Sequence, residues 1–233
     1  MKRVSKVNLF QKESLLIILL GLIIYNIFFF ILSDTLLLSL GKDDASYIEA
    51  AKQLWYQHSF HPIRPIGLPL LSGIPLLLAK STEGIIGTFM IINIVLWLFT
   101  FLLIYKTLLI QTNRKNLALA GSILFSLGIS TVSYTFVVLS ETLYIFTLTL
   151  LVYQLCLFFK TKSYNHLVLA ITILVFSCLI KPVSWYLVFV GIVTVVIFFR
   201  RIKTAKKRYV IVLILAIGCL AIQLISIKNT YGN

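Results

Sequence analysis

The chain has 233 residues, of which 60% are hydrophobic and 12% are charged. Water-soluble domains contain about 45–50% apolar residues, so this composition excludes a soluble globular protein and indicates an all-α, polytopic membrane protein. The formal net charge is +14, and the distribution of this charge along the chain explains it without a nucleic-acid partner.

The cations are concentrated in four short stretches separated by long apolar runs. Fifteen of the 21 Lys and Arg residues lie within 1–12, 106–115, 160–162 and 200–208. Six of the seven acidic residues lie well inside the segments between these stretches, and the seventh, Glu13, directly follows the first stretch. Cation-rich loops of membrane proteins face the cytoplasm. We therefore expect a multi-pass protein of the cell membrane with its N-terminus in the cytoplasm.

The apolar runs predict about seven transmembrane helices, since one span takes about 20 residues. The first two are expected at 15–32 and 85–104. The run 117–159 is too long for one helix at about 1.5 Å per residue, so it should form two spans joined by an outer turn near 130–141. The last three are expected at 167–180, 183–199 and 209–227, which places the C-terminus outside and makes residues 1–233 a single membrane domain.

The first outer loop is expected to hold two interfacial segments. A helix should begin just after Asp43 and Asp44, because an apolar stripe at helical spacing follows them at Tyr47, Ile48, Ala51, Leu54 and Trp55. Such a helix should lie on the membrane surface. The apolar stretch 66–79 is too short to span and contains two prolines, so it predicts a second interfacial or re-entrant segment.

Charged residues next to hydrocarbon are costly and are therefore candidates for function. Asp43 and Asp44 fit a general base or a metal ligand, and the alternative is that one of them caps the helix. Arg64 lies between two prolines and fits either an anion ligand or a residue that reaches to the interface.

Glu141 and Lys181 are candidates of the same kind on the same predicted side of the membrane. Glu141 follows Ser140 at the start of a predicted span, where a carboxylate also suits the helix dipole. Lys181 precedes Pro182 and could equally be a boundary lysine. Two carboxylates, an arginine and a lysine facing one outer pocket would suit a reaction on a phosphate-linked substrate.

A metal site is a further alternative in the first outer loop. His58 and His61 are three residues apart and could join Asp43 as ligands. The competing interpretation is that both histidines are simply polar loop residues.

The order of these motifs resembles the GT-C superfamily of integral-membrane glycosyltransferases, which includes the protein O-mannosyltransferases and the aminoarabinose transferase of lipid A. An acidic motif, Asp-x-x-x-Tyr-x-x-x-Ala, is matched by Asp43, Tyr47 and Ala51. An Arg-x-Pro-Gly-x-Pro-like element is similar to Arg64, Pro65, Gly67 and Pro69, with Ile66 inserted. The family's Ser-Glu and Arg-Pro pairs resemble Ser140-Glu141 and Lys181-Pro182.

This resemblance runs from about residue 15 to the end and implies transfer of a sugar from a polyprenyl-phosphate donor to a lipid, glycan or protein acceptor at the outer face. It implies that Asp43 activates the acceptor hydroxyl as a base. It also implies that Arg64 and Lys181 neutralise the leaving phosphate, the kind of electrostatic term that often dominates catalysis.

The resemblance gives supporting roles to Asp44 and Glu141, as acceptor or metal contacts, and to Tyr47. The requirement for a cofactor such as a divalent metal stays open. Family members continue beyond the point where this chain ends, so the chain is expected to be the N-terminal module of a longer enzyme.

Two other functions are compatible with the sequence. A transporter or flippase for lipid-linked sugars would place ionisable residues inside several spans, where this chain has only scattered amides. A non-catalytic subunit that packs against a larger membrane partner would not need Asp43 for its function.

Overall fold

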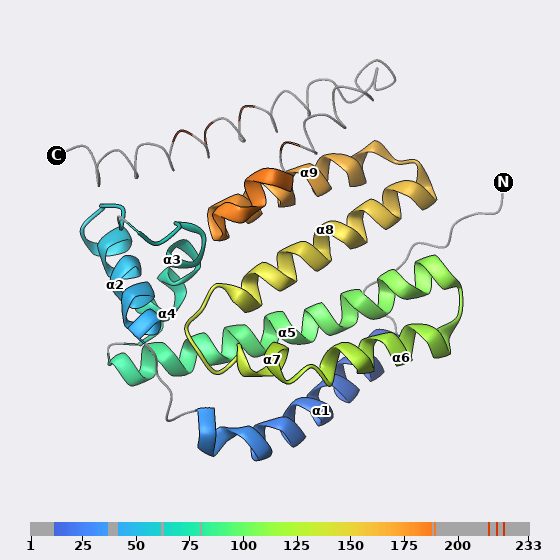
Figure 1. Cartoon of the computed structure of the whole chain (residues 1–233), viewed down its shortest axis with the longest axis horizontal. Coiled ribbons are helices and arrows are strands. Elements are labelled where there is room, and N and C mark those ends of the chain that lie inside the picture. The colour runs from blue at the N-terminus through green and yellow to red at the C-terminus, as the bar shows by residue number, and fades with distance from the viewer. Residues whose placement is uncertain are drawn as a thin grey trace.

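A computed structural model of the chain describes residues 12–36, 42–61, 63–79 and 81–187, together with residues 189, 214, 218 and 221. In this part the protein is helical and has no β-strand, which confirms the predicted all-α class. Figure 1 shows long helices lying side by side, with a group of short helices at one end.

Three of the described helices are long and apolar enough to cross a membrane. They are α1 (Lys12–Leu36), α5 (Thr82–Thr112) and α8 (Glu141–Thr161). The shorter elements are α2 (Lys42–Tyr56), α3 (Gly67–Leu71), α4 (Gly73–Leu78), α6 (Lys115–Ser126), α7 (Ile129–Ser133), α9 (Tyr164–Ile180) and the 3₁₀ turn η1 (Pro182–Ser184). These apolar helices indicate a membrane protein.

The predicted spans correspond to these helices to different degrees. The runs 15–32 and 85–104 lie wholly within α1 and α5, and 167–180 lies within the 17-residue α9. The expected spans at 183–199 and 209–227 fall mostly outside the described residues.

The run 117–159 divides close to the expected outer turn near 130–141, but its first helix, α6, is short. Helix α6 ends at Ser126 after 12 residues, and the five-residue α7 follows it. Buried polar side chains satisfy the backbone after α7: Asn93 donates to the Val137 carbonyl (3.0 Å), and Thr142 donates to the Tyr134 carbonyl (3.0 Å). These two bonds satisfy carbonyl groups that have no helical partner, and periodicity alone does not predict them.

The helix predicted after the two aspartates is present as α2, but protein covers its apolar face. Tyr47, Ile48 and Ala51 are buried in a cluster with residues of α3, α4, α5, α8 and α9. Trp55 and Tyr56, at the C-terminal end of α2, are exposed instead. The stripe was expected to rest on the membrane surface, but α2 packs on α3 and α4, which lie beside it (Figure 1).

The two ends of the helix stack carry different charges. The turns between α5 and α6 and between α8 and α9 lie at one end, the far end, together with Lys115, Lys160 and Lys162. An ion pair between Lys115 and Glu13 places the start of α1 there as well. The opposite end, the site end, holds α2, α3, α4, the start of α8 and the end of α9 (Figure 1).

Candidate functional site

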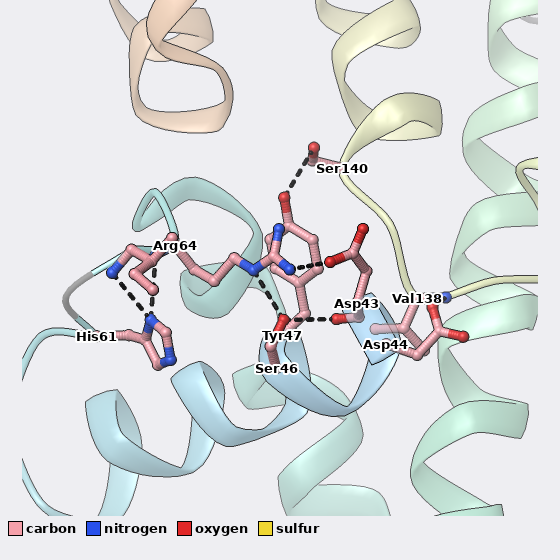
Figure 2. Close-up of polar contacts among 9 residues, drawn as sticks. Asp43, Asp44, Ser46, Tyr47, His61, Arg64, Val138 and Ser140 are labelled. Carbon is pink, nitrogen blue, oxygen red and sulfur yellow. Dashed lines mark hydrogen bonds and ion pairs between the residues drawn. The ribbon is translucent and has the colours of Figure 1, made fainter. Parts of the chain in front are cut away.

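The first turn of α2 binds an arginine from the following loop. Arg64 forms an ion pair with Asp43, and its Nε donates to the Ser46 hydroxyl at 2.7 Å. Its guanidinium also lies 4.6 Å from the centroid of the Tyr47 ring, a cation–π distance. Residues 43, 46 and 47 share one helix face because neighbours three and four apart do so, and Figure 2 shows Arg64 lying across that face.

The loop that carries Arg64 is held by His61. The His61 Nδ1 accepts hydrogen bonds from the backbone N–H groups of Ile63 and Arg64, both at 3.1 Å. Burial and the nearby Arg64 charge lower the pKa of His61 below its usual range, whereas Glu49 opposes this shift. A neutral imidazole is the form that can accept these bonds, so His61 has a structural role here.

The alternative of a metal site gains no support from this geometry. No three His, Cys, Asp or Glu side chains among the described residues form a group that could hold a metal ion. The Nδ1 of His61 is already occupied by backbone N–H groups.

Asp44 faces away from Arg64 and holds a different segment. Helix α2 begins at Lys42, so both aspartates lie in its first turn and neither is the cap that the sequence suggested. The Asp44 side chain is buried, and its Oδ1 accepts the backbone N–H of Val138 at 3.0 Å. This contact pins the irregular loop 134–140, and the predicted catalytic role of Asp44 stays a prediction.

A second ion pair joins α8 to the end of α9. The Lys181 ammonium donates to Glu141 Oε1 at 2.7 Å, and both side chains are about one quarter exposed, at 30% and 26%. The ring of Tyr144 lies 5.6 Å from the ammonium, and the Tyr144 hydroxyl accepts a hydrogen bond from Ser184. The Oε2 of Glu141 is buried without a hydrogen-bond donor in the described part of the chain.

Two contacts bring the two ion pairs into one region. The Tyr47 hydroxyl donates to the hydroxyl of Ser140, the residue before Glu141, at 3.2 Å (Figure 2). On the other side, Gly67 packs on the end of α9 so closely that a Cβ there would lie 2.7 Å from the Leu179 carbonyl oxygen. This close approach needs a glycine. The contact between Gly67 and Leu179 packs the segment that follows Arg64 on the segment that precedes Lys181.

The structure therefore brings together most of the charged residues predicted from the sequence. Asp43 and Arg64 form one pair, Glu141 and Lys181 form the other, and Tyr47 contacts the first pair and the segment of the second. The sequence reading missed three polar partners, namely Ser46, Tyr144 and Ser184. Ser46 and Tyr144 each lie three residues after a predicted carboxylate, so helical spacing could have found them.

Both cations keep donors that an anion could use. A guanidinium has five N–H donors and an ammonium three. Ser46 and Asp43 use Nε and one terminal nitrogen of Arg64, and no described residue accepts from the other terminal nitrogen. Glu141 is the described hydrogen-bond acceptor of Lys181. The two ion pairs together carry no net charge. A phosphate that enters the site could therefore accept hydrogen bonds from the donors of Arg64 and Lys181 that are still free.

Comparison with known proteins returned no match. The sequence matches no family model and no curated protein, and the fold matches no solved structure. The resemblance to GT-C glycosyltransferases therefore rests on the motifs quoted above.

Proposed function

We propose that the chain is a membrane glycosyltransferase module that uses a polyprenyl-phosphate-linked sugar as its donor. The observation that carries this proposal is the meeting of Asp43, Arg64, Glu141 and Lys181, from four separate segments, as two linked ion pairs at one end of the helix stack. Arginine and lysine together suit a phosphate, and a carboxylate suits the activation of a hydroxyl.

In this proposal the reaction is a displacement at the anomeric carbon of the donor sugar. Asp43 takes the proton of the acceptor hydroxyl while the acceptor oxygen forms a bond to that carbon. The bond from the carbon to the phosphate oxygen breaks, and its electron pair leaves with the lipid phosphate. Arg64 and Lys181 stabilise the charge that develops on this phosphate. Glu141 keeps Lys181 in place and offers its second oxygen to a substrate hydroxyl.

The proposed membrane topology has seven spans, with the far end in the cytoplasm and the site end at the outer surface. The far end carries the cation-rich turns, as the positive-inside rule requires. At the site end, α4 exposes Ile74, Leu77 and Leu78, next to the exposed Trp55 and Tyr56 of α2. Aromatic and aliphatic side chains of this kind suit a membrane interface, so α2, α3 and α4 would meet the outer leaflet.

The test is transfer of a labelled sugar from a polyprenyl-phosphate donor by the purified full chain in detergent or vesicles. Asp43→Asn keeps the size of the side chain and removes the base, so turnover should fall while insertion and folding stay normal. Glu49→Gln is the matched control, because Glu49 is an exposed carboxylate on the same helix. Equal turnover of wild type and Asp43→Asn would contradict the role of Asp43 as the base, and no turnover by either protein would favour a non-catalytic subunit.

A further inference from the structure

Tyr47 touches both halves of the site with different parts of its side chain. Its ring faces the Arg64 guanidinium at 4.6 Å, and its hydroxyl donates to Ser140 at 3.2 Å. The side chain is only 6% exposed. Tyr47 therefore bridges the loop that carries Arg64 and the residue that precedes Glu141.

The ring and the hydroxyl of Tyr47 have separable roles. Packing in the core and the cation–π contact require only the aromatic ring, which phenylalanine would also supply. A buried hydroxyl costs free energy unless it is hydrogen-bonded, and its partner here is Ser140. The hydroxyl is thus the part of Tyr47 that ties α2 to the start of α8.

Ser140 leads directly to the second cation. Glu141 follows it as the first residue of α8 and accepts the hydrogen bond of Lys181. Asp44 holds the same loop through Val138, two residues before Ser140. Helix α2 therefore fixes the start of α8 at two points, and Tyr47 provides the one that also contacts Arg64.

We propose that Tyr47 is a positioning residue that holds Arg64 and Lys181 so that both bind the same phosphate monoester. This inference rests on the proposed function, because it deepens the phosphate-binding role given there to the two cations. A distance of 3.2 Å is long for a bond between hydroxyls. The hydroxyl should therefore matter little for folding of the free protein and more when an anion draws the two segments together.

The inference predicts a particular pattern of ligand binding. If both cations hold one anion, removing either should cost most of the binding, and removing both should cost little more. Without the Tyr47 hydroxyl, Arg64 and Lys181 should bind the anion independently. The losses of binding free energy caused by replacing each of them should then add in the double variant. Tyr47→Phe alone should weaken binding about fivefold, the size expected for one hydrogen bond.

The experiment measures binding of farnesyl phosphate to the purified full chain in detergent, with farnesol and inorganic phosphate as the comparison ligands. Arg64→Gln, Lys181→Gln and their combination are each prepared with and without Tyr47→Phe. Ser140→Ala removes the same hydrogen bond from its other side and should match Tyr47→Phe. Tyr56→Phe is the control, since Tyr56 is an exposed tyrosine on the same helix.

The expected result is a fivefold loss for Tyr47→Phe and for Ser140→Ala, unchanged melting temperatures, and additive cation losses only in the Tyr47→Phe background. Normal binding by Tyr47→Phe, with large losses for Arg64→Gln and Lys181→Gln, would overturn the role of Tyr47 and leave the proposed function standing. Farnesyl phosphate that binds no better than farnesol would overturn both. Inorganic phosphate that binds as well as farnesyl phosphate would overturn the lipid-linked donor.

Discussion

The ion pairs at the two ends of the molecule have the same chemistry and different surroundings. At the far end, Lys115 pairs with Glu13, and both side chains are well exposed, at 66% and 42%. At the site end, Asp43 is also well exposed, at 64%, but the Arg64 side chain is only 21% exposed and is held in addition by a hydroxyl and an aromatic face. An exposed pair contributes little free energy, whereas an enclosed cation with fixed neighbours can recognise an anion. Ion pairs occur at both ends of the molecule, so the feature that distinguishes the candidate site is the enclosure of its cation by neighbouring side chains.

The largest difference between the two ends should appear when the carboxylates are neutralised. Asp43→Asn should lower the rate of sugar transfer by at least about 100-fold, the lower range for loss of a general base. Glu13→Gln should leave the rate within about twofold, because this exposed pair contributes little free energy and lies at the other end of the molecule. Transfer of labelled sugar measures both. A similar fall in the transfer rate of both variants would show that the site end has no special role in catalysis.

A side chain at Gly67 should disturb the site without changing any charge. In Gly67→Ala the new Cβ would lie 2.7 Å from the Leu179 carbonyl oxygen, so the loop must move away from α9. Overpacking of this kind costs about 1–3 kcal/mol, and we expect a lower melting temperature together with weaker farnesyl phosphate binding. Gly87→Ala is the control, because nothing lies within 4 Å of a Cβ at Gly87. If Gly67→Ala and Gly87→Ala have the same melting temperature and the same affinity for farnesyl phosphate, the contact between Gly67 and α9 does not help to form the site.

An exchange of cations sharpens the comparison further. Arg64→Lys keeps the charge but loses the hydrogen bond from Nε to Ser46 and the planar contact with Tyr47. We expect about tenfold weaker farnesyl phosphate binding, since two contacts of roughly 0.5–1 kcal/mol each are lost. Lys115→Arg at the far end should change binding less than twofold. Full binding by Arg64→Lys would mean that charge alone suffices.

The smallest effect concerns pH. The pKa of His61 is lowered in the folded protein, so folding favours the neutral ring. Its contribution to stability is complete above the unfolded value near 6.5 and is lost as the pH falls through the lower folded value. His61→Asn keeps an acceptor that does not titrate, so the melting temperature of wild type should fall relative to that of this variant between pH 7 and pH 5. If the melting temperature of wild type instead rises relative to that of His61→Asn between pH 7 and pH 5, His61 does not act as a neutral hydrogen-bond acceptor.

Charge placement and helical period predicted much of the fold. The long apolar runs gave α1, α5, α8 and α9, and the stripe after Asp44 gave α2. The irregular segment near 130–141 was predicted as a turn, but the contact that satisfies its backbone was not, because Asn93, which donates to the Val137 carbonyl, is distant in sequence. The cover over Tyr47 and Ile48 was missed for the same reason, since a helical stripe does not say whether lipid or protein faces it.

The sequence predicted which charged residues belong to the candidate site, but not which of them form ion pairs with one another. The sequence singled out Asp43, Arg64, Glu141 and Lys181 from their position near hydrocarbon, but it gave no reason to pair 43 with 64 or 141 with 181. These pairs depend on how α2 packs against the loop 134–140 and how α3 packs against α9. The orientation of Asp44 toward Val138 depends on the same packing.

Sidedness of single cysteines tests most directly the central claim that both ion pairs form one site at one face of the membrane. Cysteines at Ile63 and Val183, exposed neighbours of Arg64 and Lys181, and at Lys115 at the far end are introduced one at a time after the native cysteines are replaced. An impermeant thiol reagent on intact cells should label Ile63→Cys and Val183→Cys, and should label Lys115→Cys only after permeabilisation. Labelling of Ile63→Cys and Val183→Cys from opposite sides would contradict the account.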